Sequence, residues 1–394
     1  MNTNIACIRL GNIHVIPVAC PKLACEFLRK HYSVFAFRPI TMASQSLSRG
    51  FLTVGKMRKL MASQTISLAR LRWLHDKRIE EADNLVRYIY NKCSNNIGGG
   101  AVLDVRVLGW QYVGNVIKRF LFNKRYFGKG RADGGRGVEE KKHIDAVFRG
   151  LSLLFAFCIS DYLPWLRWLD LDGHQRIVKE ALGVFNKYHD PVIDERLQEL
   201  RDGKEGWRDD HLKREPQDLF DVFILLKDDK GKPLLSTKEI RAQAVRLVQE
   251  FDFHKLNYVK ACGNPPGFIH SPPSTSHTLL LSRIGLGRNH KVWDEPLKFK
   301  QERHLKDGLD VDPVESELRF ISFSTGKLGC MGVGLGSAMT IMLLARLLQG
   351  FSWEVPPVES SINQTAESAD NLFLAQPLRA LAKPRLPNHV YPAN

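Results

Sequence analysis

The sequence predicts a mainly α-helical fold with a minor β region. Three observations carry this prediction: helical periodicity dominates the first two-thirds of the chain, short apolar segments of strand length lie near both ends, and no internal repeat is visible. The 394 residues are 44% hydrophobic and 25% charged, as in soluble globular proteins, which excludes wholesale disorder. A chain of this length can bury a large hydrophobic core.

The first half of the chain contains the clearest helices. Residues 1–20 alternate polar and apolar side chains, as a pair of strands would. Apolar residues recur at helical spacing over 65–93, with charged residues on the opposite face. Residues 103–128 should be helical after a short extended start, and a Gly-rich charged loop should follow over 128–142. A second amphipathic helix is predicted over 174–200.

The second half of the chain contains more loops and linkers between its predicted helices and strands. Residues 203–217 are charged and poor in apolar side chains, which predicts a surface connection. The segment KACGNPPGFIHSPPSTSH, residues 260–277, contains four prolines, which block a helix and weaken strand pairing, so it predicts a linker. Residues 277–305 should form a short apolar strand followed by a loop-rich run, and another strand is expected at RFISFS, residues 319–324. An apolar helix is expected over 337–349.

The chain is basic, with 57 Lys and Arg against 42 Asp and Glu and a net charge of +15. Such a charge favours acidic partners. A nucleic-acid surface would interleave aromatic residues within one basic patch, and no such patch is visible. We therefore expect no nucleic-acid partner, and we assign the charge to a solvated surface and a docking face for an acidic protein.

Cysteine and histidine spacing excludes several common sites. The seven cysteines are scattered and odd in number, which favours a reducing compartment over a disulfide scaffold. No two cysteines have CxxC spacing and no two histidines lie four residues apart, so no zinc site is expected. The Gly-Lys pairs lack a following Ser or Thr and no GxSxG occurs, which excludes a P-loop and a nucleophile elbow.

Membrane anchorage is not expected from the sequence. Residues 1–20 lack the long apolar run of a signal peptide or membrane anchor. Residues 331–351 are long enough to cross a bilayer but carry Arg346 and four glycines, so a buried core helix is the better interpretation.

The segment FSTGKLGCMG, residues 323–332, carries the chemistry. It places Cys330 in a Gly-rich turn immediately before the apolar helix, where unpaired backbone N–H groups and the helix dipole favour an ionised sulfur. The same geometry suits a metal ligand. The glycines, among them Gly326 and Gly332, remove side chains where a flat cofactor must approach the backbone.

Two other interpretations of this segment remain open at this stage. In one, Cys330 is simply a small buried residue and the glycines only form a turn. In the other, Gly332, Gly334 and Gly336 line a dinucleotide phosphate turn and Glu354 binds a ribose. The second is disfavoured because the 40 residues after Glu354 show no alternating strand and helix pattern.

The order FxxGxxxCxG followed by an apolar helix resembles the haem-ligand loop of the cytochrome P-450 superfamily. SFSTGKLGC, residues 322–330, is similar to the form found in plant amino-acid N-monooxygenases, which produce aldoximes. The resemblance extends over nearly the whole chain and implies one haem-thiolate monooxygenase domain, 1–394. Further similar blocks are SDYLPWLRWLDLDGH, NKYHDPVIDERL, DVFILLKDDKGKPLLSTKEIRAQ, LGRNHKVWDEPLKFKQERHL and the tail DNLFLAQPLRALAKPRLPNHVY.

The resemblance implies roles for individual residues. Cys330 would be the axial thiolate on the iron of haem b, a ligand that favours O–O cleavage. Phe323 would lie near the ring, while Gly326 and Gly332 would let the loop and helix approach it. Arg303 would have a structural role, locking this loop to a Glu-x-x-Arg helix. No side chain is assigned as catalytic.

Several departures from the family pattern predict an incomplete fold. The distal helix and the Glu-x-x-Arg helix are missing at expected deletion junctions near 243–246 and 262–278, and the chain is expected to start inside the catalytic domain. Two upstream Glu-x-x-Arg matches, 26–29 and 205–208, are expected to be surface pairs. Leu328 occupies the position of an arginine that pairs with a haem propionate.

The function implied is N-hydroxylation of an L-amino acid towards an aldoxime, with O₂ and electrons that NADPH supplies through an NADPH-cytochrome reductase. The alternative is a catalytically impaired remnant of the family that binds haem weakly or not at all. Relatives reside in the endoplasmic reticulum membrane, and this chain is expected to be soluble or peripheral.

Aromatic and acid-base residues outside this loop are given structural interpretations. Trp110, Tyr112, Trp165 and Trp168 lie in apolar stretches and are expected in the core. His189, with the adjacent Asp190, has no third partner in the sequence that would indicate acid-base chemistry.

Overall fold

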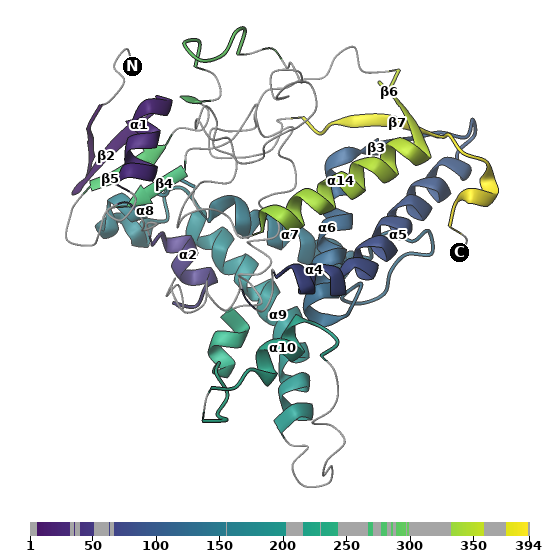
Figure 1. Cartoon of the computed structure of the whole chain (residues 1–394), viewed down its shortest axis with the longest axis horizontal. Helices are drawn as coiled ribbons and strands as arrows, with labels where there is room; N and C mark the ends of the chain where they lie inside the picture. Colours follow the sequence, from purple (N-terminus) through teal and green to yellow (C-terminus); the bar gives the residue numbers. More distant parts are fainter. Residues whose placement is uncertain are drawn as a thin grey trace.

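The computed structural model describes residues 6–31, 35, 40–50, 63, 67–154, 156–201, 216–228, 230–242, 267–270, 277–281, 285–286, 289–296, 298, 332–357 and 376–392. Figure 1 shows a helical body with a small sheet on either side of it. The expected strand 319–324, the junction near 243–246 and most of the expected connection 203–217 lie outside the described residues.

Four long helices form the body: α5 (His75–Ser94), α6 (Val105–Phe122), α7 (Val138–Leu153) and α9 (His174–Arg201). Helix α7 packs against α9, and α6 contacts both α5 and α7. The shared core is apolar and includes Leu85, Ile89, Val116, Phe120, Ile144 and Val178. The shorter helices are α1 (Pro21–Cys25), η1 (Glu26–Lys30), α2 (Met42–Leu47), α4 (Leu68–Trp73), α8 (Ile159–Tyr162), η3 (Pro164–Leu169), α10 (Leu219–Leu225) and η8 (Asn388–Val390).

The helices predicted from periodicity are confirmed, with shifted boundaries. The helix expected over 65–93 is divided at Leu74, whose φ of −90° and ψ of 6° end α4 before α5 begins. The extended start expected before the next helix is β3 (Ala101–Asp104). Asp104 then caps α6, since its Oδ1 accepts hydrogen bonds from Arg106 N (2.9 Å) and Val107 N (3.2 Å).

Helix α7 begins earlier than expected, whereas α9 lies where it was expected. The loop expected over 128–142 ends earlier, because α7 already begins at Val138. Glu139 and Glu140 lie in its first turn, where carboxylates favour a helix N-terminus. The helix expected over 174–200 is confirmed as α9, and it continues through Pro191.

One four-stranded sheet has the order β1 (Ile8–Leu10), β2 (Ile13–Val18), β5 (His277–Leu281), β4 (Gly267–His270). The expected N-terminal strand pair is confirmed as β1 and β2, which are antiparallel. Strand β2 is parallel to β5, with Ile16 opposite Leu279.

The linker predicted over 260–277 is partly wrong. Gly267–His270 forms β4, which pairs antiparallel with β5 and places Phe268 opposite Leu280. The proline pairs at 265–266 and 272–273 flank GFIH without interrupting it. The β-favouring residues between them can therefore pair with a neighbouring strand.

The second sheet has the order β3, β7 (Arg379–Pro384), β6 (Phe351–Glu354), and all its pairs are antiparallel. Strand β6 directly follows the apolar helix α14 (Val333–Gly350). Tyr391 fixes this junction, because its ring stacks on Tyr90 at 4.3 Å and its hydroxyl donates a hydrogen bond to Gly350 O.

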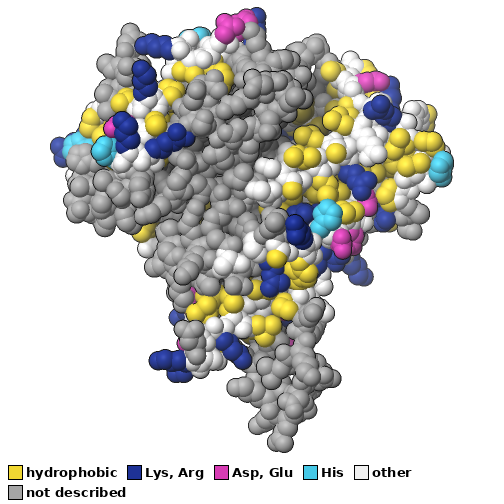
Figure 2. All heavy atoms as spheres, in the orientation of Figure 1, with side chains coloured by type: hydrophobic (Ala, Val, Ile, Leu, Met, Phe, Trp, Pro, Cys, Tyr) yellow, Lys and Arg dark blue, Asp and Glu magenta, His cyan; other side chains and the backbone are white. Residues whose placement is uncertain are grey.

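The expectation that 331–351 form a buried core helix holds for one face of α14. Leu335, Met339, Leu343 and Leu347 are buried on that face. On the opposite face Ile341, Leu344 and Leu348 are exposed by 67%, 47% and 59%. Figure 2 shows hydrophobic side chains over this part of the molecule. Among the helices that the structure describes, none combines the length and apolar character needed to cross a bilayer.

The core placement expected for the four aromatic residues is right for two and wrong for two. Tyr112 is buried, and the Trp110 ring stacks on Phe148 with 4.4 Å between centroids. Trp165 and Trp168 are 59% and 80% exposed instead. Both lie on η3, a six-residue 3₁₀ helix at the surface, none of whose residues is buried. An apolar stretch in the sequence therefore does not guarantee a buried one.

Candidate functional site

The described part of the predicted site is the start of α14. Gly332 is its N-cap residue, is buried, and has φ of −82° and ψ of 5°. Phe323, Gly326, Cys330 and Arg303 lie outside the described residues, so their expected roles remain predictions.

The start of α14 can accept an anion. Glycine has no side chain with which to cap the helix, and Gly336 N donates the first ladder hydrogen bond to Gly332 O at 2.8 Å. The amide groups of the first turn can therefore turn towards an acceptor supplied by the preceding loop. A side chain at Gly334 would meet no atom within 4 Å, which leaves open space beside this turn.

Packing against α5 holds α14 in place. Arg346 forms an ion pair of 2.9 Å with Asp83 of α5, and Gly350 lies against Val86 of the same helix. The indole Nε1 of Trp353 donates a hydrogen bond to Leu347 O at 3.0 Å, which ties β6 to the last turn. These contacts all lie in the last two turns of α14, so they fix its C-terminal end.

The dinucleotide interpretation is wrong. Gly334 and Gly336 lie within α14 and not in a phosphate turn. Glu354 ends β6, a four-residue strand in an antiparallel sheet, and its carboxylate pairs with Lys383 Nζ at 2.7 Å. A dinucleotide fold would need parallel strands on either side of the helix.

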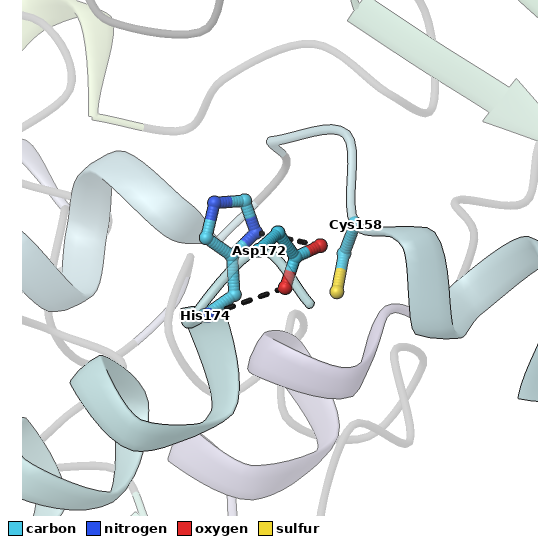
Figure 3. Close-up of side chains that lie close together, drawn as sticks. All are labelled: Cys158, Asp172 and His174. Carbon is cyan, nitrogen blue, oxygen red and sulfur yellow. Dashed lines mark hydrogen bonds and ion pairs between the residues drawn. The ribbon is translucent and has the colours of Figure 1, made fainter. Parts of the chain in front are cut away.

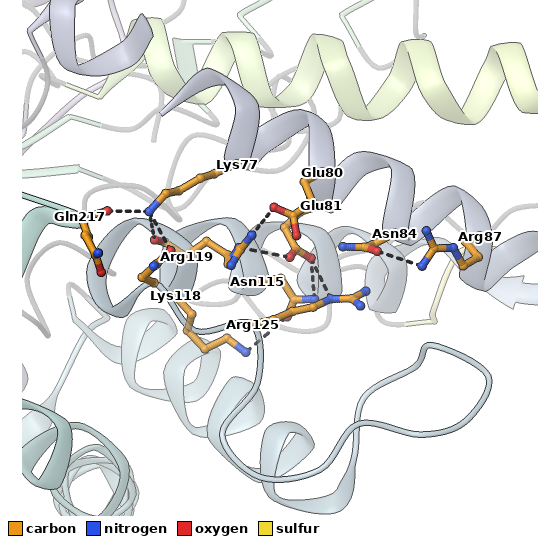
Figure 4. Close-up of polar contacts among 11 residues, drawn as sticks. Lys77, Glu80, Glu81, Asn84, Arg87, Asn115, Lys118, Arg119, Arg125 and Gln217 are labelled. Atoms are coloured by element: carbon orange, nitrogen blue, oxygen red, sulfur yellow. Dashed lines mark hydrogen bonds and ion pairs between the residues drawn. The ribbon is translucent and has the colours of Figure 1, made fainter. Parts of the chain in front are cut away.

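Sequence reasoning missed a buried polar network between α5, α6 and α7, part of which Figure 4 shows. Glu81 Oε2 accepts hydrogen bonds from Asn115 Nδ2 (3.2 Å) and Arg125 Nε (3.1 Å). Lys118 forms an ion pair with Glu140, and both side chains are almost fully buried. Asn115 and Lys118 lie three residues apart within a largely apolar part of α6, and this is the sequence signal that could have revealed the network.

Burial dominates the electrostatics of this network. It raises the pKa of Glu81 and of Glu140, and it lowers the pKa of Lys118 to about 8, against the opposing attraction of Glu140. Glu140 also accepts a hydrogen bond from Phe127 N at 3.1 Å. We hold that the pair is ionised at neutral pH, because each charge contacts the other directly.

A second buried contact joins α7 and α9. His143 Nε2 and His189 Nε2 lie 2.9 Å apart, and the rings of Phe122, Phe127 and Phe185 surround the pair. Burial holds the pKa of His143 well below its ordinary range and lowers that of His189 to about 3. The pair joins two helices, in agreement with the structural role expected for His189.

Asp190, the neighbour of His189, also has the structural role expected. Its carboxylate pairs with Arg49 at 3.2 Å and lies 3.8 Å from Arg241. Of the two Glu-x-x-Arg matches, 26–29 lies in η1, where Glu26 pairs with Lys30 at 2.8 Å on the surface. The match at 205–208 lies outside the described residues.

Comparison with protein families gives the decisive observation. A family model for cytochrome P450 matches residues 3–250 and 277–383. The chain belongs to the cytochrome P450 family. Its resemblance to that family, seen first in the Cys330 loop and the blocks around it, is thereby confirmed, as is the mainly helical fold.

Curated cytochrome P450 relatives match the whole chain. A tryptophan N-monooxygenase of Prunus mume is 45% identical, and the alignment covers 100% of this chain and 85% of that protein. A phenylalanine N-monooxygenase of Arabidopsis thaliana is 44% identical over 100% of this chain and 86% of its own length. A tyrosine N-monooxygenase of Sorghum bicolor is 43% identical, with 100% and 82% covered.

Cytochromes P450 are monooxygenases that use haem b, molecular oxygen, a small-molecule substrate and electrons from a redox partner. The described residues at the start of this P450's α14 fit that cofactor. Neither the buried Gly332 nor the exposed Gly334 carries a side chain that would block a flat ring, and the first-turn amides favour an anionic ligand before the helix.

Proposed function

We propose that this cytochrome P450 hydroxylates the amino nitrogen of an L-amino acid and leads to an aldoxime. The observation that carries the proposal is its full-length similarity, at 41–45% identity, to relatives named as N-monooxygenases of tryptophan, phenylalanine, tyrosine, isoleucine and valine. All five amino acids have neutral, mostly apolar side chains. The substrate proposed for this chain is therefore an aromatic or branched aliphatic amino acid.

Cys330 is the axial ligand in this proposal. When bound, the haem supplies the oxygen-activating chemistry, and the chain supplies the thiolate that holds the iron. Phe323 and Gly326 would lie beside the ring, Gly332 would let α14 approach it, and Arg303 would secure the ligand loop. The support is that α14 begins three residues after Cys330, and that its N-cap residue, Gly332, has no side chain with which to cap the first-turn amides.

The redox partner proposed is an NADPH-cytochrome reductase. A net charge of +15 favours an acidic partner surface and accelerates its association.

We further propose that residues 1–394 form one domain with internal deletions near 243–246 and 262–278. The alignment with the tryptophan enzyme is 467 positions long although this chain has 394 residues, so the alignment contains gaps on the side of this chain. The family model also leaves residues 251–276 unmatched. A catalytically impaired remnant is therefore the second candidate function.

Exposed and unpartnered side chains support the deletions. The apolar face of α14 formed by Ile341, Leu344 and Leu348 is exposed, as expected for a helix that lacks a packing partner. Nearby, Arg78 Nε and Nη1 on α5 and Tyr112 Oη on α6 are buried without a hydrogen-bond partner in the described part of the chain. Such groups are rare in complete cores.

For location, we propose attachment to the surface of the endoplasmic reticulum membrane. The support is the exposed apolar cluster of Trp165, Trp168, Leu169 and Leu171, which lies on and just after η3. Indole rings favour the membrane interface because one edge is polar and the rest is apolar.

Two measurements test the proposed function separately. The purified chain would be titrated with amino acids while the haem absorption spectrum is followed, and aldoxime would be measured after addition of reductase and NADPH. Spectral shifts and aldoxime formation with neutral amino acids support the enzyme. Haem binding without aldoxime supports the remnant. A folded chain that binds haem weakly or not at all also supports the remnant, whereas an unchanged thiolate band in Cys330→Ser would contradict the assignment of Cys330 as the ligand.

A further inference from the structure

Three side chains that commonly bind metals meet away from the start of α14. Cys158 lies immediately before α8, Asp172 lies in the turn between η3 and α9, and His174 is the first residue of α9. One ligand atom from each lies within 4.8 Å of the other two (Figure 3). Cys158 is buried, and the other two are half-buried.

The contact between His174 and Asp172 is longer than a hydrogen bond. His174 Nδ1 and Asp172 Oδ2 are separated by 3.5 Å, whereas N–H···O bonds are about 2.7–3.2 Å long. Two ligand atoms that each lie about 2.0–2.2 Å from a tetrahedral zinc ion are about 3.4 Å apart. The observed spacing therefore matches a pair of metal ligands.

Local hydrogen bonds involve two of the three side chains, Asp172 and Cys158. Asp172 Oδ2 accepts a hydrogen bond from Ile159 N at 2.8 Å, and Oδ1 accepts one from His174 N at 3.2 Å. These bonds join α8 to the start of α9. Cys158 Sγ lies 3.1 Å from Ser160 Oγ, and this hydroxyl could still donate a hydrogen bond to the sulfur once the sulfur binds a metal. Each carboxylate oxygen has a further lone pair with which to bind a metal.

The charges around the cluster favour a cation. The Asp172 carboxylate and the Cys158 sulfur are the groups of the cluster that can carry a negative charge towards a bound cation. The Asp161 carboxylate is close enough to interact electrostatically with Cys158. Asp161 itself interacts with the positive charge of Arg167. The positive end of the α9 dipole opposes a cation. A thiolate and a carboxylate together outweigh that partial charge.

We propose that Cys158, Asp172 and His174 bind a divalent transition-metal ion, with Zn²⁺ the best match. Sulfur, nitrogen and oxygen ligands together suit zinc, whereas Mg²⁺ and Ca²⁺ prefer oxygen alone. On binding, a Zn–S bond replaces the S–H bond of Cys158, and the thiol proton passes to solvent. Water completes the tetrahedron. The ion holds the connection between α7 and α9 against the first turn of α9.

The test uses the purified full-length chain with whatever haem it carries. After treatment with a chelator, the chain would be titrated with Zn²⁺ and the heat of binding measured by calorimetry. X-ray absorption at the zinc edge, to which iron does not contribute, would then identify the atoms bound to zinc. We expect one zinc per chain, one sulfur neighbour at about 2.3 Å, and release of about one proton. Co²⁺ in place of Zn²⁺ would report the coordination geometry in haem-free chain.

Variants distinguish this site from other thiols and histidines. Cys158→Ser and His174→Ala should each weaken zinc binding at least about tenfold, an expectation based on the loss of one ligand. Matched controls are Cys93→Ser, whose thiol donates to Ala382 O in another part of the fold, and His389→Ala on the surface. These should bind zinc as the parent chain does.

A variant that keeps the hydrogen bonds to the backbone tests whether a loss of zinc affinity is caused by misfolding. Asp172→Asn retains an oxygen for Ile159 N or His174 N, so it should stay folded while losing zinc affinity. The proposal is overturned if zinc has no sulfur neighbour, or if Cys158→Ser binds zinc as tightly as the parent. Both readouts are independent of monooxygenase activity.

Discussion

Lys118 and Glu140 form a salt bridge in the interior of the helical body. The side chains are 2% and 0% exposed, and neither charge reaches water. Asn115 Oδ1 accepts a hydrogen bond from Lys118 Nζ at 3.3 Å, and Phe127 N donates one to Glu140, so both ions have neighbours besides each other. The pair therefore costs much desolvation energy and depends on both members being present.

Removing one member should destabilise the protein strongly. Lys118→Ala leaves the Glu140 carboxylate buried without its cation, and we expect a loss of about 3–5 kcal/mol in the free energy of unfolding. The double change Lys118→Met with Glu140→Leu should cost less than the sum of the single changes. Urea unfolding followed by circular dichroism measures both.

The surface pair between Arg119 and Glu80 is the matched control. Glu80 is 52% exposed, so Glu80→Ala should cost less than about 1 kcal/mol. A loss for Lys118→Ala as small as that of the control would show that the buried pair is not a stability determinant.

The His143–His189 pair should make the protein sensitive to acid. Burial lowers both pKa values, and that of His189 falls to about 3, so the unfolded chain binds more protons than the folded chain below pH 6.5. The contribution to stability is complete above pH 6.5 and declines as the pH falls towards 3.

Replacing both histidines by leucine should remove that decline. The slope of unfolding free energy against pH should become shallower by up to about 1.4 kcal/mol per pH unit for each proton no longer taken up. Denaturant unfolding at pH values from 7 to 4 gives the slope, and His389→Leu on the surface is the control. An unchanged slope would mean that the pair is protonated in the folded state.

At the scale of elements, the turn between β1 and β2 connects the N-terminal sheet to α8. Gly11 has φ of +58°, and an added Cβ would lie 2.3 Å from Tyr162 O. Gly99 has a similar φ of +68° but nothing within 4 Å. Both glycines therefore adopt the left-handed backbone conformation, but only at Gly11 would a side chain also collide with a distant part of the chain.

Substituting each glycine by alanine separates the two effects. Gly99→Ala should cost about 1 kcal/mol from the left-handed backbone alone. Gly11→Ala should cost more, about 2–4 kcal/mol, because the Cβ also displaces the backbone at Tyr162. Thermal or urea unfolding compares them, and equal costs would show that the sheet moves freely relative to α8.

The exposed tryptophans of η3 should govern adsorption to membranes. Changing both Trp165 and Trp168 to serine removes apolar area that is 59% and 80% exposed, so the stability should change by less than about 0.5 kcal/mol. Binding to vesicles of phosphatidylcholine and phosphatidylserine should fall several-fold.

Vesicle sedimentation measures this adsorption. Ile97→Ser removes an even more exposed apolar side chain from another part of the chain and should leave adsorption unchanged. If the double tryptophan variant sediments with vesicles as the parent does, the basic charge alone causes the adsorption.

At the scale of the whole molecule, the proposed deletions should impair haem binding and turnover together. Without the distal helix the reacting groups are less well placed, and small misplacements cost about 100-fold in rate. We expect aldoxime formation at least that much slower than by an intact relative. Leu328→Arg, which restores a charge for a haem propionate, should raise haem occupancy.

A ferrous carbon-monoxide difference spectrum and quantified aldoxime test these expectations. The thiolate band should disappear in Cys330→Ser and persist in Cys93→Ser. Turnover equal to that of an intact relative would show that other segments replace the distal helix.

The sequence by itself determined the local elements and the family. Apolar spacing placed α9 correctly, because a buried helical face needs that spacing whatever packs against it. Asp104 started α6 for an equally local reason, since its side chain caps the next two backbone amides. The Cys330 loop and the blocks that resemble the cytochrome P-450 superfamily required only the order of residues along the chain.

Only the tertiary structure decided which distant residues meet and which apolar residues are covered. His143 contacts His189, and Cys158 approaches Asp172 and His174, although no spacing in the sequence indicates either cluster. Trp165 and Trp168 are large apolar residues in an apolar stretch, but both are exposed. The physical reason is that burial and long-range contacts depend on how elements pack across the whole chain, whereas periodicity and capping depend on a few neighbouring residues.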